Sequence, residues 1–164
     1  MPSPTETLRI GRLRPSDAGE VLTVQRAAYV TEAQRYGAPH IPPLLETLDE
    51  LRADFVRPDV LSVGAWLGPR LVGSVRGRVD GETMELARLS VAPDMQGSGV
   101  GRALVAALHA AAPPSVTSTW LVTGARSDDN RRFYGAAGYR PTTTAPDAAG
   151  VDLVRMVRTV PAPE

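Results

Sequence analysis

The chain has 164 residues, 43% of them hydrophobic, which suits one compact domain with a single core. Eighteen basic residues balance eighteen acidic ones, so the strong positive field of a nucleic-acid-binding protein is missing and nucleic acid is not expected as a partner. The absence of cysteine excludes a thiol nucleophile, a disulfide framework and a zinc knuckle, and two histidines make a poor metal set. We therefore expect no metal.

The first residues are polar and include proline, and they lack the cationic start and apolar run of a secretion signal. No later segment approaches the length of apolar sequence that crosses a bilayer. These features predict a cytoplasmic protein without membrane contact. We find no internal repeat or interdomain linker, so residues 1–164 are predicted to form a single domain, with frayed tails at 1–6 and 160–164.

Hydrophobic periodicity predicts strands and helices in the order βααβββαβαββ. In the first half we expect a strand over 7–14, a helix from about 16 to 35, a second helix over 44–55, and strands over 59–67 and 70–80. In the second half we expect a central strand over 84–91, a helix over 100–111, a strand over 115–122, a short helix over 127–138, and strands from 139 and over 151–157.

The segment Gln96-Gly-Ser-Gly-Val-Gly-Arg102 connects the central strand to the helix that starts near Val100. The first turn of a helix has backbone N–H groups without partners and carries partial positive charge. Glycines at 97, 99 and 101 remove the Cβ atoms that would keep a phosphate away from these groups, and Arg102 adds a fork of donors. The segment is interpreted as an anion site, although three glycines in five residues are also compatible with a flexible turn.

Two common phosphate motifs do not fit this segment. A P-loop requires a lysine, and all 18 basic residues of the chain are arginine. A dinucleotide fingerprint anchored on Gly97 and Gly99 would need glycine where Arg102 stands, and it belongs to the first βα unit of a sheet, whereas several strands precede it here.

The segment resembles the Q/R-x-x-G-x-G/A acetyl-CoA signature of the GCN5-related N-acetyltransferase (GNAT) superfamily, preceded by an apolar strand that ends in Val91-Ala-Pro93. The resemblance implies an α+β fold with a central mixed, mostly antiparallel sheet of six to seven strands and about four helices. It also implies that acetyl-CoA binds as co-substrate. Backbone contacts to the pantetheine arm are expected at Leu89 and Val91, and pyrophosphate contacts at Gln96, Gly97, Ser98, Gly99, Val100, Gly101 and Arg102.

A second motif lies downstream, at Asn130-Arg-Arg-Phe-Tyr-Gly-Ala-Ala-Gly-Tyr139, and it is similar to the N-x-x-F-Y-x-x-x-G-F/Y segment of the same family. Many members carry asparagine seven residues before the tyrosine, but this chain has Ser127 there. Asn130 is therefore the residue to which we transfer the CoA contact of that asparagine.

The resemblance implies direct attack of an amine on the thioester. A free alkylamine has a pKa of about 10.4 and is mostly charged at pH 7, so a base must assist. Glu85 is the candidate, because several members carry a glutamate six residues before the position of Val91. The alternative is that Glu85 is a solvated carboxylate or an ion-pair partner of Arg76, Arg78 or Arg88, and Glu82 is a weaker candidate base.

Tyr134 is the candidate acid, because the family tyrosine at this position protonates or hydrogen-bonds the departing thiolate. A tyrosine hydroxyl stays protonated at neutral pH and can still donate to a thiolate. The competing interpretation is that Phe133 and Tyr134 are both core aromatics.

The expected acceptor is a primary amine of a small molecule or of a peptide N-terminus. Candidates for the lining of its site are Tyr29, Tyr36, His40 and Trp120, each of which could instead be a packing residue. A homodimer is possible, as dimers are common among family members. The rival hypotheses are an acyl-CoA-binding regulatory module without turnover and a structural interaction protein with a vestigial glycine loop.

Overall fold

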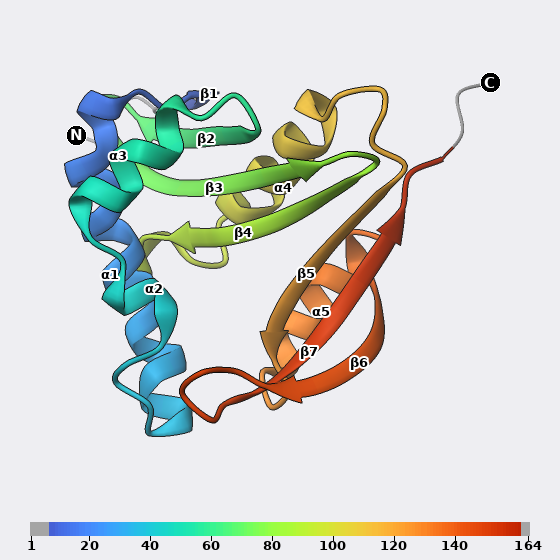
Figure 1. Ribbon diagram of the computed structural model, residues 1–164. Helices are drawn as coiled ribbons and strands as arrows, with labels where there is room; N and C mark the ends of the chain where they lie inside the picture. The colour runs from blue at the N-terminus through green and yellow to red at the C-terminus, as the bar shows by residue number, and fades with distance from the viewer. Residues whose placement is uncertain (1–6, 162–164) are drawn as a thin grey trace.

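The computed structural model describes residues 7–161, so the expected tail at 1–6 and the last three residues of the expected tail at 160–164 lie outside this range. The described chain forms one sheet with helices on both sides (Figure 1). Its elements are β1 (Leu8–Arg12), η1 (Pro15–Asp17), α1 (Ala18–Tyr36), α2 (Pro42–Leu45), α3 (Leu48–Val56), β2 (Val60–Leu67), β3 (Arg70–Asp80), β4 (Thr83–Val91), η2 (Pro93–Met95), α4 (Val100–Ala111), β5 (Ser118–Gly124), α5 (Asp128–Ala136), β6 (Arg140–Pro146) and β7 (Asp152–Thr159).

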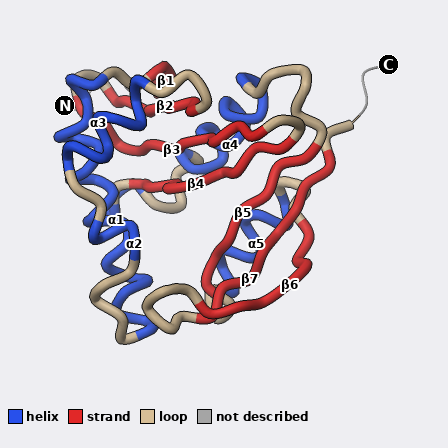
Figure 2. The backbone as a smooth tube through the Cα atoms, viewed as in Figure 1, coloured by secondary structure: helices blue, strands red, loops and turns tan. Residues whose placement is uncertain are grey.

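The seven strands lie in the order β1-β2-β3-β4-β5-β7-β6. Neighbouring strands are antiparallel except β4 and β5, which run parallel. This parallel pair is joined only where Thr83–Glu85 lies opposite Ser118–Trp120, and beyond that point the two strands diverge (Figure 2). The predicted α+β fold with a mixed, mostly antiparallel sheet is confirmed, and the divergence divides the sheet into a four-strand half and a three-strand half.

The four-strand half is packed on both faces. Helices α1 and α3 cover one face, with Leu51 and Phe55 of α3 in a buried cluster, and α4 covers the other through Leu104 and Leu108. The approach of α4 is close because β3 has glycine beneath it: a Cβ on Gly77 would lie 2.8 Å from Leu108 Cδ1. Helix α5 packs beside β5 in the other half.

The second predicted helix, over 44–55, is two helices in the structure. Thr47 forms a capping box: its hydroxyl accepts from the Glu50 N–H at 3.2 Å, and the Glu50 carboxylate accepts from the Thr47 N–H at 3.3 Å. This local signal starts α3 anew, although the leucine spacing is continuous with that of α2. The break has a structural consequence, because it releases Glu46 from the helix and lets its carboxylate enter the protein interior.

Two smaller differences concern the ends of strands. Strand β5 begins at Ser118, three residues later than the predicted start at 115, because the amides of Thr117 and Ser118 bond instead to the carbonyl of Glu82 in the β3–β4 turn. Val160, which was assigned to the tail, donates its N–H to the Thr117 carbonyl at 2.9 Å and packs on the core.

Candidate active site

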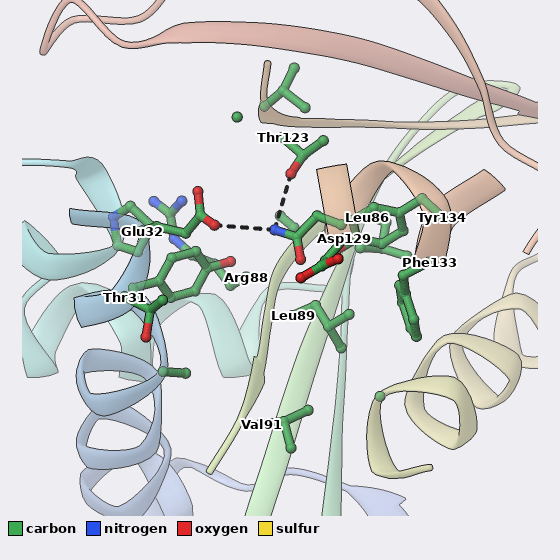
Figure 3. A pocket seen from close by; sticks show the side chains of 18 of the residues that line it. Thr31, Glu32, Leu86, Arg88, Leu89, Val91, Thr123, Asp129, Phe133 and Tyr134 are labelled. Carbon is green, nitrogen blue, oxygen red and sulfur yellow. Dashed lines mark hydrogen bonds between the residues drawn. The ribbon is translucent and has the colours of Figure 1, made fainter. Parts of the chain in front are cut away.

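A cleft of about 1090 Å³ lies where β4 and β5 separate. Its walls come from α1, β4, the glycine segment, β5, α5 and the β6–β7 loop, and Figure 3 shows part of its lining. All but one of the predicted site residues line it: Glu85, Leu89, Val91, Gln96, Gly97, Ser98, Gly99, Gly101, Arg102, Asn130 and Tyr134. The exception is Val100, the first residue of α4, whose side chain is buried in the core. Only its backbone is available at the loop.

The glycine segment presents main-chain donors at one end of the cleft. Gly97 and Gly99 have φ of 80° and 93°, a left-handed conformation that other residues rarely adopt, and the space where their Cβ atoms would lie is open. The first backbone bond of α4 runs from Ala103 N–H to Gly99 C=O, so the three amides before Ala103 have no acceptor within the helix. These amides and the positive helix end form the geometry in which phosphate oxygens bind.

Gly101 lies in the first turn of α4 and lines the cleft. A Cβ at this position would be in van der Waals contact with Phe133 Cζ at 3.4 Å and with Val91 Cγ2 at 3.6 Å. Its role at the amides stays a prediction.

The second part of β4 offers a free strand edge to the cleft. Its β3 side is paired, with Gly73 opposite Val91, but the pairing with β5 ends at Glu85. Along this edge the Val91 carbonyl accepts from the Gln96 side chain at 3.4 Å. The edge is continuous with the glycine segment through η2, so an extended ligand could pair with β4 and place its phosphates at α4.

Tyr134 lies on α5, where its side chain is mostly buried and forms part of the cleft wall (Figure 3). The ring makes edge contacts with Phe133 and Tyr139, at centroid distances of 5.1 and 6.0 Å. Burial, with smaller contributions from Tyr29, Tyr139 and Glu32, raises the pKa of Tyr134 well above its usual value. The hydroxyl is therefore protonated at neutral pH and able to donate.

Glu85 lies on β4 opposite Arg78 of β3, and it lines the cleft. The three arginines that were considered as its ion-pair partners are directed to other carboxylates. Arg76 binds Glu46 and Asp54, Arg78 binds Asp54, and the nearest carboxylate to Arg88 is Glu46. Glu82, by contrast, is an exposed residue of the β3–β4 turn and does not line the cleft.

Asn130 belongs to a polar network that connects α1 to α5. Its side-chain nitrogen donates to Glu32 Oε1 at 3.5 Å and to Thr123 Oγ1 at 3.4 Å. Figure 3 shows Glu32 and Thr123 on opposite sides of this part of the cleft, each joined by a dashed line to the side chain between them. The fully buried Ser127 donates its hydroxyl to Glu32 at 2.8 Å. Glu32 is thus the partner of Ser127, which stands where many family members have asparagine. Sequence reasoning missed this pair because the two residues are 95 positions apart in the chain.

A second polar group, which we name the charge cluster, lies on the face of the sheet that α1 and α3 cover. It consists of Gln25, Glu46, Asp54, Arg76, Arg78 and Arg88. Arg76 is its centre, with only 2% of its side chain exposed and both partner carboxylates at 2.6 Å. Burial would raise the pKa of Glu46, but hydrogen bonds from Arg76 and Gln25 lower it to about 2.

The expected acceptor lining is only half correct. Tyr29 and Tyr36 of α1 line the cleft. His40 instead lines a smaller neighbouring hollow beside Arg126, and Trp120 lies under the guanidinium of Arg155, 4.0 Å from its ring centroid.

Comparison with known proteins agrees with this architecture. A sequence model of the family described as acetyltransferase (GNAT) domain matches residues 32–160, and the chain belongs to this family. No curated protein sequence matches it significantly. Within residues 7–161, none of the helices combines the length and apolarity that a membrane-spanning helix requires.

Several solved structures share the fold. The PaiA N-acetyltransferase from Thermoplasma acidophilum, in complex with coenzyme A, is 19% identical with a TM-score of 0.77, over 94% of this chain and 99% of that one. The ribosomal-protein-S18-alanine N-acetyltransferase from Escherichia coli is 18% identical with a TM-score of 0.77, over 96% and 97%. A chimeric spermidine N-acetyltransferase from Vibrio cholerae is 17% identical with a TM-score of 0.70, over 93% and 95%.

Proposed function

We propose that the protein transfers an acetyl group from acetyl-CoA to a primary amine of a small molecule or a peptide N-terminus, by direct attack on the thioester. The observation that carries this proposal is the free edge of β4 that leads to the unpaired amides of α4. A pantetheine arm has amide groups that can pair with a strand edge, and a pyrophosphate suits a helix N-terminus. One continuous main-chain surface therefore fits both parts of CoA.

The acceptor amine must lose a proton before it attacks, and we assign this step to Glu85. At pH 7 only about one alkylamine in a thousand is neutral. Glu85 lines the cleft and forms no ion pair with an arginine among the described residues. It can take the ammonium proton directly or through a water molecule. The nitrogen lone pair then forms the new C–N bond at the carbonyl carbon.

The collapse of the tetrahedral intermediate breaks the C–S bond and releases the thiolate of CoA. We assign stabilisation of that thiolate to the Tyr134 hydroxyl, which is protonated and lies in the cleft wall. Donation from Tyr134 supplies the thiol proton, and solvent reprotonates the tyrosine. The nitrogen, which became positively charged when the C–N bond formed, releases its remaining extra proton to solvent, and this completes the proton balance. The products are the acetylated amine and CoA with a free thiol.

The test begins with thermal unfolding in the presence of acetyl-CoA, CoA, ATP and NAD. A ligand at a hundred times its Kd stabilises by about 2.7 kcal/mol, which raises the midpoint by roughly 5 to 10 °C for a chain of this size. We expect this shift with acetyl-CoA and CoA only. Thiol release is then followed across a panel of primary amines, with the amine-free rate as control.

The second candidate is an acyl-CoA-binding regulatory module without turnover, which has the same main-chain surface. A thermal shift with acetyl-CoA together with no thiol release from any amine would favour the module. No shift with either CoA compound at millimolar concentration would contradict both functions.

A further inference from the structure

Arg88 lies at an irregular point of β4, directly beside the cleft. Between β3 and β4 the pairing shifts by one residue, so that Ser74 is opposite Ser90 whereas Arg76 is opposite Ala87. Arg88 lies within this bulge and is the one described non-glycine residue with a positive φ, at 56°. Bulges redirect side chains, and such a backbone costs free energy that the surroundings must offset. The residue held in this way lines the cleft.

The guanidinium of Arg88 has no hydrogen-bond partner in the described part of the chain. Its nearest carboxylate oxygen is Glu46 Oε1 at 3.7 Å, too far for a hydrogen bond, and its Nε is buried and unpaired. Glu46 cannot serve it better, because its oxygens already accept from Arg76 at 2.6 and 2.9 Å and from Gln25 at 2.9 Å.

The carboxylates of the charge cluster are already engaged by other arginines. Its three arginines share Glu46 and Asp54, and the short contacts of these two carboxylates go to Arg76 and Arg78. The Arg88 side chain is only 23% exposed, and a poorly solvated charge whose nearest carboxylate oxygen is 3.7 Å away is costly in a folded protein. Burial correspondingly lowers the pKa of Arg88. Arg88 is therefore the arginine of the cluster whose donors remain available to a ligand in the cleft.

This unpaired donor set lies away from the phosphate end of the cleft. Arg88 precedes Val91 by three residues, about 10 Å of strand, and the unpaired amides of α4 begin further along the chain. In Figure 3, Arg88 lies on the side of α1, with Thr31 and Glu32, whereas Phe133 and Tyr134 lie on the side of α5. Arg88 therefore belongs to the part of the cleft that is left for the acceptor.

We propose, on the basis of the function above, that Arg88 binds a carboxylate of the acceptor, so that the acceptor class is a small amino acid or an amine of similar zwitterionic form. The planar guanidinium fork suits the two oxygens of a carboxylate, and its buried Nε has no hydrogen-bond acceptor among the described residues. Glu85, three residues before Arg88 on β4, receives the ammonium end. Polyamines, which bring only positive charge, meet an uncompensated arginine here.

The experiment compares matched acceptors. The twenty common amino acids are screened by calorimetry for binding to the CoA complex and by thiol release for turnover with acetyl-CoA. The best amino acid is then compared with its amide, its decarboxylated amine and its aminophosphonate analogue. We expect kcat/KM, or affinity where turnover is absent, to be at least about 30-fold higher for the carboxylate than for the decarboxylated amine.

Variants assign this preference to one residue. Arg88→Gln should remove the preference by lowering kcat/KM for the amino acid about 30-fold, with less than about threefold change for the decarboxylated amine. Arg88→Lys, which keeps the charge without the fork, should restore part of it. Arg57→Gln is the matched control: it removes an equal charge, but from an arginine outside the cleft that is bound to Asp59 at 2.8 Å, and should leave the preference intact.

Two results with the parent protein would overturn the proposal: no amino acid binds or reacts, or the amide, the decarboxylated amine or the aminophosphonate gives a higher kcat/KM or affinity than the carboxylate. A third is that Arg88→Gln still prefers the amino acid to its decarboxylated amine. These outcomes are separate from failure of the proposed function. Acetyl-CoA binding with turnover of other amines would contradict only the acceptor class, and amino-acid binding without turnover would contradict only the transferase activity.

Discussion

The two ends of the cleft differ in whether main-chain or side-chain groups line them. The end at α4 is made of main-chain groups: the glycine conformations, the unpaired amides of the first helical turn and the free edge of β4. The opposite end is made of side chains that come from α1, β4, β5 and α5. Every sequence supplies main-chain groups, so the first end needs only glycines at the right positions. The second end depends on tertiary packing, and it is where family members can differ in acceptor.

The largest expected effect is on the free energy of unfolding, through the charge cluster that lies next to the side-chain end of the cleft. Arg76→Ala leaves Glu46 and Asp54 in the interior without their principal partner, and breaking a buried ion pair on one side costs about 3–5 kcal/mol of unfolding free energy. Chemical denaturation measures this loss. The control is Arg57→Ala, which breaks a pair of similar geometry with Asp59 on the surface and should leave stability unchanged. Equal effects of the two variants would contradict a structural role for the charge cluster.

The next effect is on the chemistry at β4. Glu85→Gln removes the proposed base and should lower kcat/KM about 100-fold at pH 7. The deficit should shrink as the pH rises, because more of the acceptor amine is then neutral without assistance. The thermal shift with acetyl-CoA should be unchanged, since the donor end is made of main chain. Glu82→Gln, outside the cleft, is the control, and a pH-independent deficit in Glu85→Gln would argue against a base.

Tyr134→Phe tests the other proton carrier. It should lower kcat by tenfold or more and leave CoA affinity nearly unchanged, because only the hydroxyl is lost from a ring that still packs against Phe133. Tyr139→Phe is a suitable control, since it removes a neighbouring buried hydroxyl that bonds to Thr119 rather than facing the cleft. Unaltered turnover in Tyr134→Phe would make Tyr134 a packing residue.

The main-chain end is tested by Gly99→Val. A β-branched residue at a φ of 93° costs at least about 1–2 kcal/mol, so the loop should rearrange and CoA affinity should fall roughly tenfold. Isothermal titration with CoA measures this. The control is Gly135→Ala on α5, where φ is ordinary and no atom lies within 4 Å of the added Cβ, so CoA affinity should not change. If both variants bind CoA like the parent, the glycine loop is only a turn.

This contrast also explains which features the sequence predicted. The order of helices and strands along the chain, the glycine loop and the motif that contains Tyr134 follow from local patterns, namely periodicity, turn residues and short motifs. Glu32, Ser127 and Thr123 meet through contacts across most of the chain, and no spacing in the sequence reports such contacts. The sequence did not predict the helix break at Glu46, because the leucine periodicity continues through it. The capping box that begins at Thr47 is a local pattern that could have predicted the break.

The smallest effect concerns the layer beneath Tyr134, where side-chain hydrogen bonds make stability depend on pH. Thr119 donates to the Tyr139 oxygen at 3.0 Å, and the Tyr139 hydroxyl lies 2.7 Å from His109 Nε2, to which it can donate when that nitrogen is unprotonated. Burial, with help from Arg158, lowers the pKa of His109 to about 4. Between pH 6.5 and 4 the unfolded chain therefore binds more protons than the folded one, and stability falls as the pH falls through this window.

His109→Gln removes the titrating group, so the fall in the unfolding midpoint from pH 7 to pH 5 should be smaller in the variant than in the parent. Because the ring is only partly buried, we expect a difference of about 3 °C. Thermal scans of both proteins at the two pH values measure it, and other acidic groups cancel in the comparison. A parallel pH response would mean that His109 binds protons equally in the folded and the unfolded chain, so that neither burial nor the contact with Tyr139 disfavours the charged ring.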